Sequence, residues 1–164
     1  MKNILIVDMQ NGFINDNNRQ IIEKINKYLE NNKFDNVIYT RYRNYNDSPF
    51  VKILDWRAMT TLEEQEFCVN FLKDAMVIQK VGYGVRQEDI LNLKELDIDE
   101  IEVCGTDTDA CVLAIAFLLF DNNIKPIILK DLCASSSSNI EMHNMAIKVM
   151  ERQFGSKNVI NTNE

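Results

Sequence analysis

The sequence has few of the residues that build metal centres, fibrous repeats or membrane spans. Its 164 residues include one histidine, two prolines and five glycines. A single histidine, His143, excludes a metal site built on several histidines. So few glycines and prolines exclude a collagen-like or low-complexity chain. The longest apolar run, residues 110–120, is 11 residues long, which is shorter than the roughly 18 residues needed to cross a bilayer.

Cysteine pairs and nucleotide-binding motifs are also missing. The four cysteines contain no CxxC pair, and the first residues show no secretory-signal pattern. We therefore expect reduced thiols and a cytoplasmic location. The segment Gly82-Tyr83-Gly84 lacks the third glycine of a dinucleotide fingerprint, and neither GxxxxGK[ST] nor GxSxG occurs. These absences predict a protein without a bound cofactor.

Charge and length limit the partners and the domain count. Eighteen basic residues against 25 acidic ones give a net charge of −7. Such an acidic chain is not expected to bind nucleic acid or an anionic membrane. With 46% apolar residues over 164 positions, the chain has the size and core-forming content of one domain, residues 1–164.

Hydrophobic patterning alternates between strand-like and helix-like segments. Strands are predicted over residues 3–8, 36–40, 75–80, 100–105 and 126–129, with a short sixth strand over 157–160. Helices are predicted over 18–31, 61–72, 86–96, 109–122 and 138–154. This alternation predicts right-handed parallel crossovers. The expected fold class is α/β, a Rossmann-like three-layer α/β/α sandwich around a six-stranded parallel sheet.

Local signals refine two of these helices. Thr61-Leu62-Glu63-Glu64 and Ser138-Asn139-Ile140-Glu141 both have the form of a capping box, which begins a helix. The segment 41–59, which holds the only tryptophan, Trp56, shows neither period and is expected to be irregular.

Three reactive side chains follow the carboxyl ends of predicted strands. Asp8 and Lys80 end two strands, and Cys111 begins the helix after another. In a parallel sheet these ends share the edge where ligands bind. A nearby lysine and a helix start would lower the thiol pKa below its free value of about 8.5, and Asp8 would accept the proton. Ordinary roles, a core cysteine, a turn-capping aspartate and a solvated lysine, remain the alternatives.

Longer motifs around these residues resemble a known family. Residues Val7–Phe13 read VDMQNGF, Val103–Val112 read VCGTDTDACV, and Lys130–Ser135 read KDLCAS. They are similar to the opening, nucleophile and following motifs of the isochorismatase-like cysteine hydrolases, a superfamily that includes nicotinamidases and N-carbamoylsarcosine amidase. Lys80 stands where that family keeps its lysine. The similarity implies the family's six-stranded parallel sheet.

The resemblance implies a catalytic triad. Asp8 would be the proton acceptor, Lys80 the orienting cation, and Cys111 the nucleophile. The family's cis peptide ahead of the cysteine would join Thr106 to Asp107. The backbone N–H groups of Asp107 and Cys111 would then stabilise the oxyanion. Polar Thr106 and Asp107 replace the apolar pair that is usual in the family.

Metal binding is where the sequence departs from the nicotinamidases, which hold a metal through Asp-x-His and further histidines. Between Thr40 and Lys80 the chain has Asp47 and Asp55 but no histidine. We therefore expect no metal, hydrolysis that is insensitive to chelators, and a substrate other than nicotinamide. His143 fills a position where the family often has histidine, and we interpret it as structural.

The retained cysteine favours hydrolysis of a small-molecule amide, carbamoyl or ureido C–N bond, because relatives that cleave vinyl ethers commonly lack it. The resemblance suggests that Phe13 lines the pocket, with Trp56 and Tyr83 as weaker candidates. Three arginines are candidates for binding a substrate carboxylate, against a plain surface role: Arg41, Arg43 and Arg57. A non-catalytic binding module and a vinyl-ether hydrolase remain alternative functions. Family members commonly self-associate, so a homo-oligomer, a dimer or larger, is expected.

Overall fold

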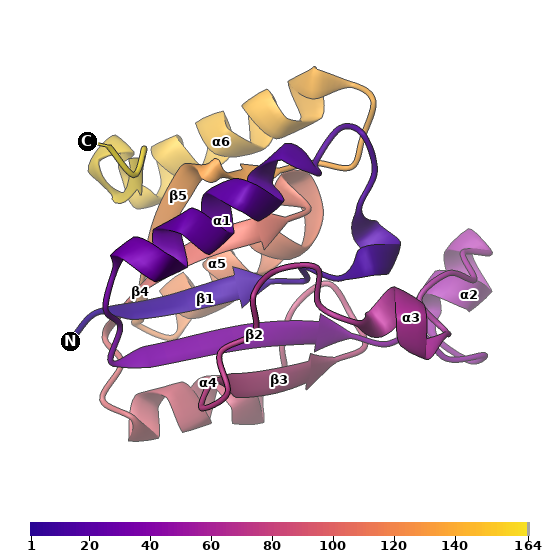
Figure 1. Cartoon of the computed structure of the whole chain (residues 1–164), viewed down its shortest axis with the longest axis horizontal. Helices are drawn as coiled ribbons and strands as arrows, with labels where there is room; N and C mark the ends of the chain where they lie inside the picture. The colour runs from indigo at the N-terminus through magenta and orange to yellow at the C-terminus, as the bar shows by residue number, and fades with distance from the viewer. Residues whose placement is uncertain (164) are drawn as a thin grey trace.

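The computed structural model describes residues 1–163 and contains a six-stranded sheet, all parallel, in the order β3-β2-β1-β4-β5-β6. The strands are β1 (Asn3–Val7), β2 (Asn36–Tyr42), β3 (Met76–Lys80), β4 (Glu100–Thr106), β5 (Lys125–Ala134) and β6 (Val159–Ile160). Helices lie on both faces of the sheet, with α1 in front of it and α5 behind it in Figure 1. The predicted α/β class and six-stranded parallel sheet are confirmed.

Helices and single turns connect the strands. The helices are α1 (Gln20–Asn31), α2 (Pro49–Leu54), α3 (Leu62–Gln65), α4 (Gln87–Glu95), α5 (Leu113–Asp121) and α6 (Ile140–Phe154). The turns are the 3₁₀ turns η1 (Asn11–Phe13) and η3 (Ser156–Asn158) and the π-helical turn η2 (Thr108–Val112). Within residues 1–163, no helix is long and apolar enough to cross a membrane.

Strand β1 forms the centre of the sheet because its five residues are all buried and four of them, residues 4–7, are apolar. It pairs with β2 on one side and β4 on the other. The chain builds β2 and β3 outward on one side and then crosses back to β4. Such a reversal leaves a crevice at the carboxyl ends of the two central strands.

The predicted helix over 61–72 is wrong in length. Its capping box is present, with Thr61 accepting from the Glu64 backbone, but α3 ends at Gln65. The chain then becomes extended, and Phe67 forms an antiparallel bridge with Gln10 in the segment after β1. Pairing with a distant segment has overridden the local helical signal.

The segment 41–59, expected to be irregular, contains the short helix α2. Ser48 caps it by accepting from the Val51 backbone, Pro49 occupies its first turn, and Asp55 ends it in a left-handed conformation with φ 50°. Serine followed by proline is a recognised helix start, so a signal was present. Six residues are too few to show a helical period.

Among the other boundaries that differ from the prediction, two have a clear physical cause. The N-cap of α6 is Asn139, whose side chain accepts from the Glu141 backbone, so the capping box expected from Ser138 is wrong by one residue. Strand β5 continues to Ala134 rather than ending at residue 129, because its pairing with β4 resumes beyond an irregularity opposite Val103–Gly105.

Gly105 allows β4 to approach β1 closely just before the crevice. Its φ is +122°, and a Cβ there would lie 2.2 Å from the backbone oxygen of Val7. The Val7 backbone cannot rotate away as a side chain could, and residues other than glycine rarely adopt this backbone conformation. Glycine at this position therefore sets the distance between the strand that leads to Asp8 and the strand that leads to Cys111.

Gly105→Ala should destabilise the protein strongly, by about 3 kcal/mol. The new methyl group would force β4 away from β1. Gly82→Ala is the matched control, because a Cβ at Gly82 meets nothing within 4 Å. Urea unfolding followed by circular dichroism measures both variants. Equal stability of the two variants would contradict the role given to Gly105.

Candidate active site

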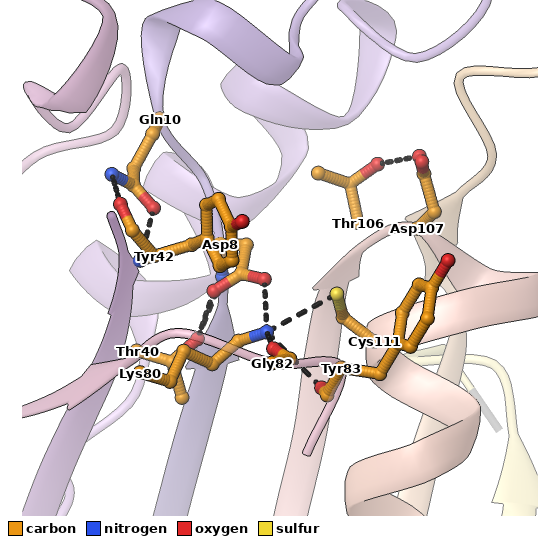
Figure 2. A network of polar contacts seen from close by, with 10 residues as sticks. All are labelled: Asp8, Gln10, Thr40, Tyr42, Lys80, Gly82, Tyr83, Thr106, Asp107 and Cys111. Carbon is orange, nitrogen blue, oxygen red and sulfur yellow. Dashed lines mark hydrogen bonds and ion pairs between the residues drawn. The ribbon is translucent and has the colours of Figure 1, made fainter. Parts of the chain in front are cut away.

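The carboxyl edge of the sheet brings Asp8, Lys80 and Cys111 together, as the sequence predicted (Figure 2). Asp8 follows β1 in a left-handed conformation with φ 47°, which turns the chain sharply at the strand end. Lys80 ends β3, two strands away, and neighbouring strands are about 4.8 Å apart. Only a long side chain can cross β2 to meet Asp8.

The Lys80 ammonium is held by four groups at once. Its Nζ lies 2.8 Å from Asp8 Oδ2 in an ion pair and donates to Cys111 Sγ at 3.2 Å. It also donates to the backbone oxygens of Gly82 at 2.7 Å and Tyr83 at 3.0 Å. Lys80 and Asp8 are 2% and 1% exposed. The ammonium is therefore fixed between the carboxylate and the thiol, away from water.

Thr40 of β2 fixes the second oxygen of Asp8. Its hydroxyl donates to Asp8 Oδ1 at 2.5 Å and accepts from the Asp8 backbone N–H at 2.9 Å. Gln10 ties the same turn to β2, donating to the Tyr42 backbone oxygen and accepting from the Tyr42 N–H at 2.7 Å. One carboxylate oxygen thus faces Thr40 and the other faces Lys80.

Cys111 lies in η2, the turn that leads into α5, and is buried. Burial raises the pKa of its thiol above the usual value; the Asp8 carboxylate raises it further, and the Lys80 ammonium lowers it by less. The expectation of a depressed thiol pKa is therefore wrong for the free protein. The sequence indicated an attraction between the thiolate and Lys80, but the extent to which Cys111 is buried depends on packing that the sequence does not show.

Lys80 shows the complementary shift. Burial by itself would lower its pKa, but the Asp8 carboxylate and the hydrogen bonds to Asp8 and Cys111 outweigh burial and raise it. The resting site therefore holds a charged ammonium with a neutral thiol. The carboxylate already neutralises the one positive charge, so a thiolate would leave a second, uncompensated anion in the interior.

A cavity of about 480 Å³ opens onto Cys111. Its lining residues are Gly12, Phe13, Ile14, Asn15, Tyr42, Phe50, Leu54, Trp56, Tyr83, Asp107, Ala110, Cys111 and Ser136. Phe13, Trp56 and Tyr83, the three candidates taken from the sequence, are all in this set. Their role in binding a substrate stays a prediction.

Sequence reasoning missed two aromatic residues of this lining, Tyr42 and Phe50. Tyr42 ends β2. The carboxyl-end rule, by which side chains at the carboxyl ends of parallel strands share one edge, selected Asp8 and Lys80 and applies to Tyr42 as well. Phe50 lies on α2, which was not predicted. Its ring centroid is 4.8 Å from that of Tyr83 and 5.7 Å from that of Trp56.

The Thr106–Asp107 peptide bond is cis. The Asp107 side chain points back to the loop after β5, where its Oδ1 accepts from the Ser136 N–H at 2.6 Å and its Oδ2 from the Ser136 hydroxyl at 2.7 Å. Thr106 also donates to Oδ1, at 2.6 Å (Figure 2). The polar pair thus forms a connected network at the cavity wall.

The remaining candidates lie outside this cavity. His143 is half-buried, its Nδ1 is 2.9 Å from the Thr108 hydroxyl, and burial lowers its pKa. The guanidinium of Arg41 lies 4.5 Å from the Phe67 ring centroid, and Arg57 pairs with an exposed carboxylate. None of the three candidate arginines is among the described lining residues.

The other three cysteines are free thiols. Cys104 and Cys133 are fully or nearly buried, and Cys68 is partly buried. Burial raises the pKa of Cys68 to about 11 and that of Cys133 to about 12. Burial is the largest cause for both thiols, and no lysine lowers their pKa as Lys80 does at Cys111.

Fold and site together define a class: parallel α/β proteins with a buried cysteine beside an aspartate–lysine pair at the carboxyl edge. The sequence model of the Isochorismatase domain family matches residues 2–164, and the chain belongs to that family. No curated protein matches it in sequence.

Solved structures share the fold at low sequence identity. An isochorismatase-like hydrolase from Alkaliphilus metalliredigens is 22% identical, with a TM-score of 0.80 over 93% of this chain and 92% of that one. A zinc complex of pyrazinamidase from Pyrococcus horikoshii is 20% identical, with a TM-score of 0.80 over 93% and 96%. N-carbamoylsarcosine amidase from Thermoplasma acidophilum is 20% identical, with a TM-score of 0.77 over 94% of both chains.

The residues between β2 and β3 do not fit a zinc ion such as that pyrazinamidase structure holds. The segment has no histidine. Asp47 pairs with Lys52 and Asp55 with Arg57, all four exposed. Across residues 1–163, no three His, Cys, Asp or Glu side chains gather as metal ligands.

Thr40→Val should destabilise the protein by about 1–3 kcal/mol, because it leaves a buried carboxylate oxygen and a buried N–H without their partner. Thr40→Ser, which keeps the hydroxyl, should lose less. Urea unfolding measures both variants. A serine variant that is the less stable of the two would show that the Thr40 methyl group, rather than its hydroxyl, matters.

Proposed function

We propose that the protein is a metal-independent cysteine hydrolase that cleaves the C–N bond of a small amide, carbamoyl or ureido compound through a thioester. The observation that carries this proposal is the Lys80 ammonium, placed between the Asp8 carboxylate and the Cys111 sulfur where the sulfur meets the cavity. Two comparisons support it: the chain belongs to the Isochorismatase family, and its fold is similar to that of an N-carbamoylsarcosine amidase.

The first half of the reaction needs one proton carrier. Cys111 Sγ attacks the carbonyl carbon while its proton moves to Asp8. The carbonyl oxygen becomes an oxyanion, which the backbone N–H groups of Asp107 and Cys111 stabilise. Protonated Asp8 then gives the proton to the departing nitrogen. The C–N bond breaks, an amine or ammonia leaves, and the acyl group remains on sulfur.

Hydrolysis of the thioester repeats these steps with water. Asp8 takes a proton from a water molecule while the water oxygen attacks the acyl carbon, and the C–S bond then breaks. The proton returns to the Cys111 sulfur and the acid product leaves. Lys80 stays charged throughout, and its positive charge offsets whichever of Asp8 or Cys111 is the anion.

Metal independence rests on the donor set. The chain offers exposed, lysine- and arginine-paired aspartates where a histidine-containing metal site would be needed. The buried thiol beside Asp8 supplies the nucleophile instead. The retained cysteine also favours acyl transfer over protonation of a vinyl ether.

Incubating the protein with a panel of small amides, carbamoyl and ureido compounds should release ammonia or amine from at least one of them. A chelator should leave the rate unchanged. Cys111→Ala should reduce it by at least about 10⁴-fold, since the nucleophile is gone. Mass spectrometry of the quenched wild-type protein should show the acyl adduct on Cys111.

Two outcomes would replace the proposal. Activity that survives Cys111→Ala would favour a vinyl-ether hydrolase, in which the cysteine is dispensable. Binding of panel compounds without any turnover would favour a binding module that retains the hydrolase fold. Activity lost on chelation and restored by metal would contradict the metal-independent mechanism.

A further inference from the structure

The cavity in front of Cys111 combines aromatic rings with a single type of charge. Its five lining rings contact one another: Phe13 stacks on Trp56 at 6.1 Å and 11°, and Phe13 is 5.7 Å from Tyr42. Phe50 joins them to Tyr83. Ring faces are electron-rich, and they attract cations that lie over them.

Asp107 is the one charged side chain among the lining residues that the structure describes. Its Oδ1 accepts two hydrogen bonds, from Thr106 and the Ser136 N–H, whereas its Oδ2 accepts one, from the Ser136 hydroxyl. A carboxylate oxygen has two acceptor positions. Asp107 Oδ2 therefore keeps capacity for a further donor.

No lysine or arginine among the described lining residues neutralises the Asp107 carboxylate inside the cavity. Lys80 is outside the lining set, and its Nζ is occupied by Asp8, Cys111 and two backbone oxygens. Arg57, outside the lining set, pairs with Asp55 at 2.7 Å. The whole chain carries a net charge of −7, which draws cations toward it and repels anions.

From this geometry we infer the substrate class of the proposed hydrolase: a small amide whose far end carries an ammonium group, with Asp107 as its counter-ion and the aromatic rings around it. The inference rests on the proposed function only for the amide end, which must reach Cys111. Asp107 is then a specificity-determining residue, and a substrate carboxylate would be disfavoured.

Binding to the Cys111→Ala protein tests the inference without turnover. Three para-substituted benzamides serve as probes: 4-(aminomethyl)benzamide is cationic, 4-(hydroxymethyl)benzamide neutral and of similar size, and 4-carbamoylbenzoate anionic. Trp56, the only tryptophan, lines the cavity, so its fluorescence reports binding. The cationic probe should bind at least about tenfold more tightly than the neutral one, and the anionic probe most weakly.

Two charge-removing variants in the Cys111→Ala background locate the effect. Asp107→Asn should abolish the preference for the cation and leave the neutral probe's affinity within about twofold. Asp55→Asn is the matched control: it removes the same charge from an exposed residue between Leu54 and Trp56, and asparagine tolerates its left-handed conformation. This control should keep the preference.

The outcomes separate this inference from the proposed function. Equal affinity for the cationic and neutral probes, tightest binding of the anion, or no binding of the cation would overturn it, and these comparisons need no change at Asp107. A preference that persists in folded Asp107→Asn would overturn the assignment to Asp107. Cation-selective binding by a protein that hydrolyses no amide would uphold the ligand class while the hydrolase proposal fails.

Discussion

The buried ammonium of Lys80 is the interaction on which the rest of the site depends. A positive charge at 2% exposure is tolerated only because Asp8 and two backbone oxygens surround it. The site needs one anion for each ammonium. Either the Asp8 carboxylate or the Cys111 thiolate can fill that place at low cost, but not both at once. The proposed chemistry follows from this limit, since Asp8 takes up the proton that leaves Cys111 and returns one to the sulfur at the end.

The surrounding fold holds this balance in place. Gly105 lets β4 approach β1, so that the turn carrying Cys111 lies near the strand carrying Asp8. Thr40 occupies the other oxygen of Asp8 and leaves Oδ2 for Lys80. Burial then keeps the thiol neutral at rest. The nucleophile would form only when a bound carbonyl is there to be attacked.

Much of the fold was predictable because its signals are local. Buried apolar runs placed β1, β3 and β4 within a residue of their observed ends, and the carboxyl-end rule brought Asp8, Lys80 and Cys111 to one edge. What the sequence could not reveal depends on distant contacts. The short α3 results from pairing near Gln10.

In the site, too, the features that the sequence did not predict depend on contacts between distant segments. The raised thiol pKa results from burial, and the place of Asp107 in the cavity wall results from its bonds to a loop 29 residues away. Both depend on how separate segments pack, which neither periodicity nor motif spacing encodes. Self-association also stays a prediction.

The most direct test of the one-anion limit is the pH dependence of Cys111 alkylation by iodoacetamide in wild-type protein and Asp8→Asn, with mass spectrometry identifying the modified cysteine. In the wild type the thiol pKa should lie above its free value of about 8.5. Asp8→Asn should lower it by more than one unit, because the thiolate becomes the only anion beside Lys80. Cys68, whose raised pKa results from burial and not from Asp8 or Lys80, should keep its profile. A wild-type Cys111 pKa below 8.5, or one that Asp8→Asn leaves unchanged or raises, would contradict the account.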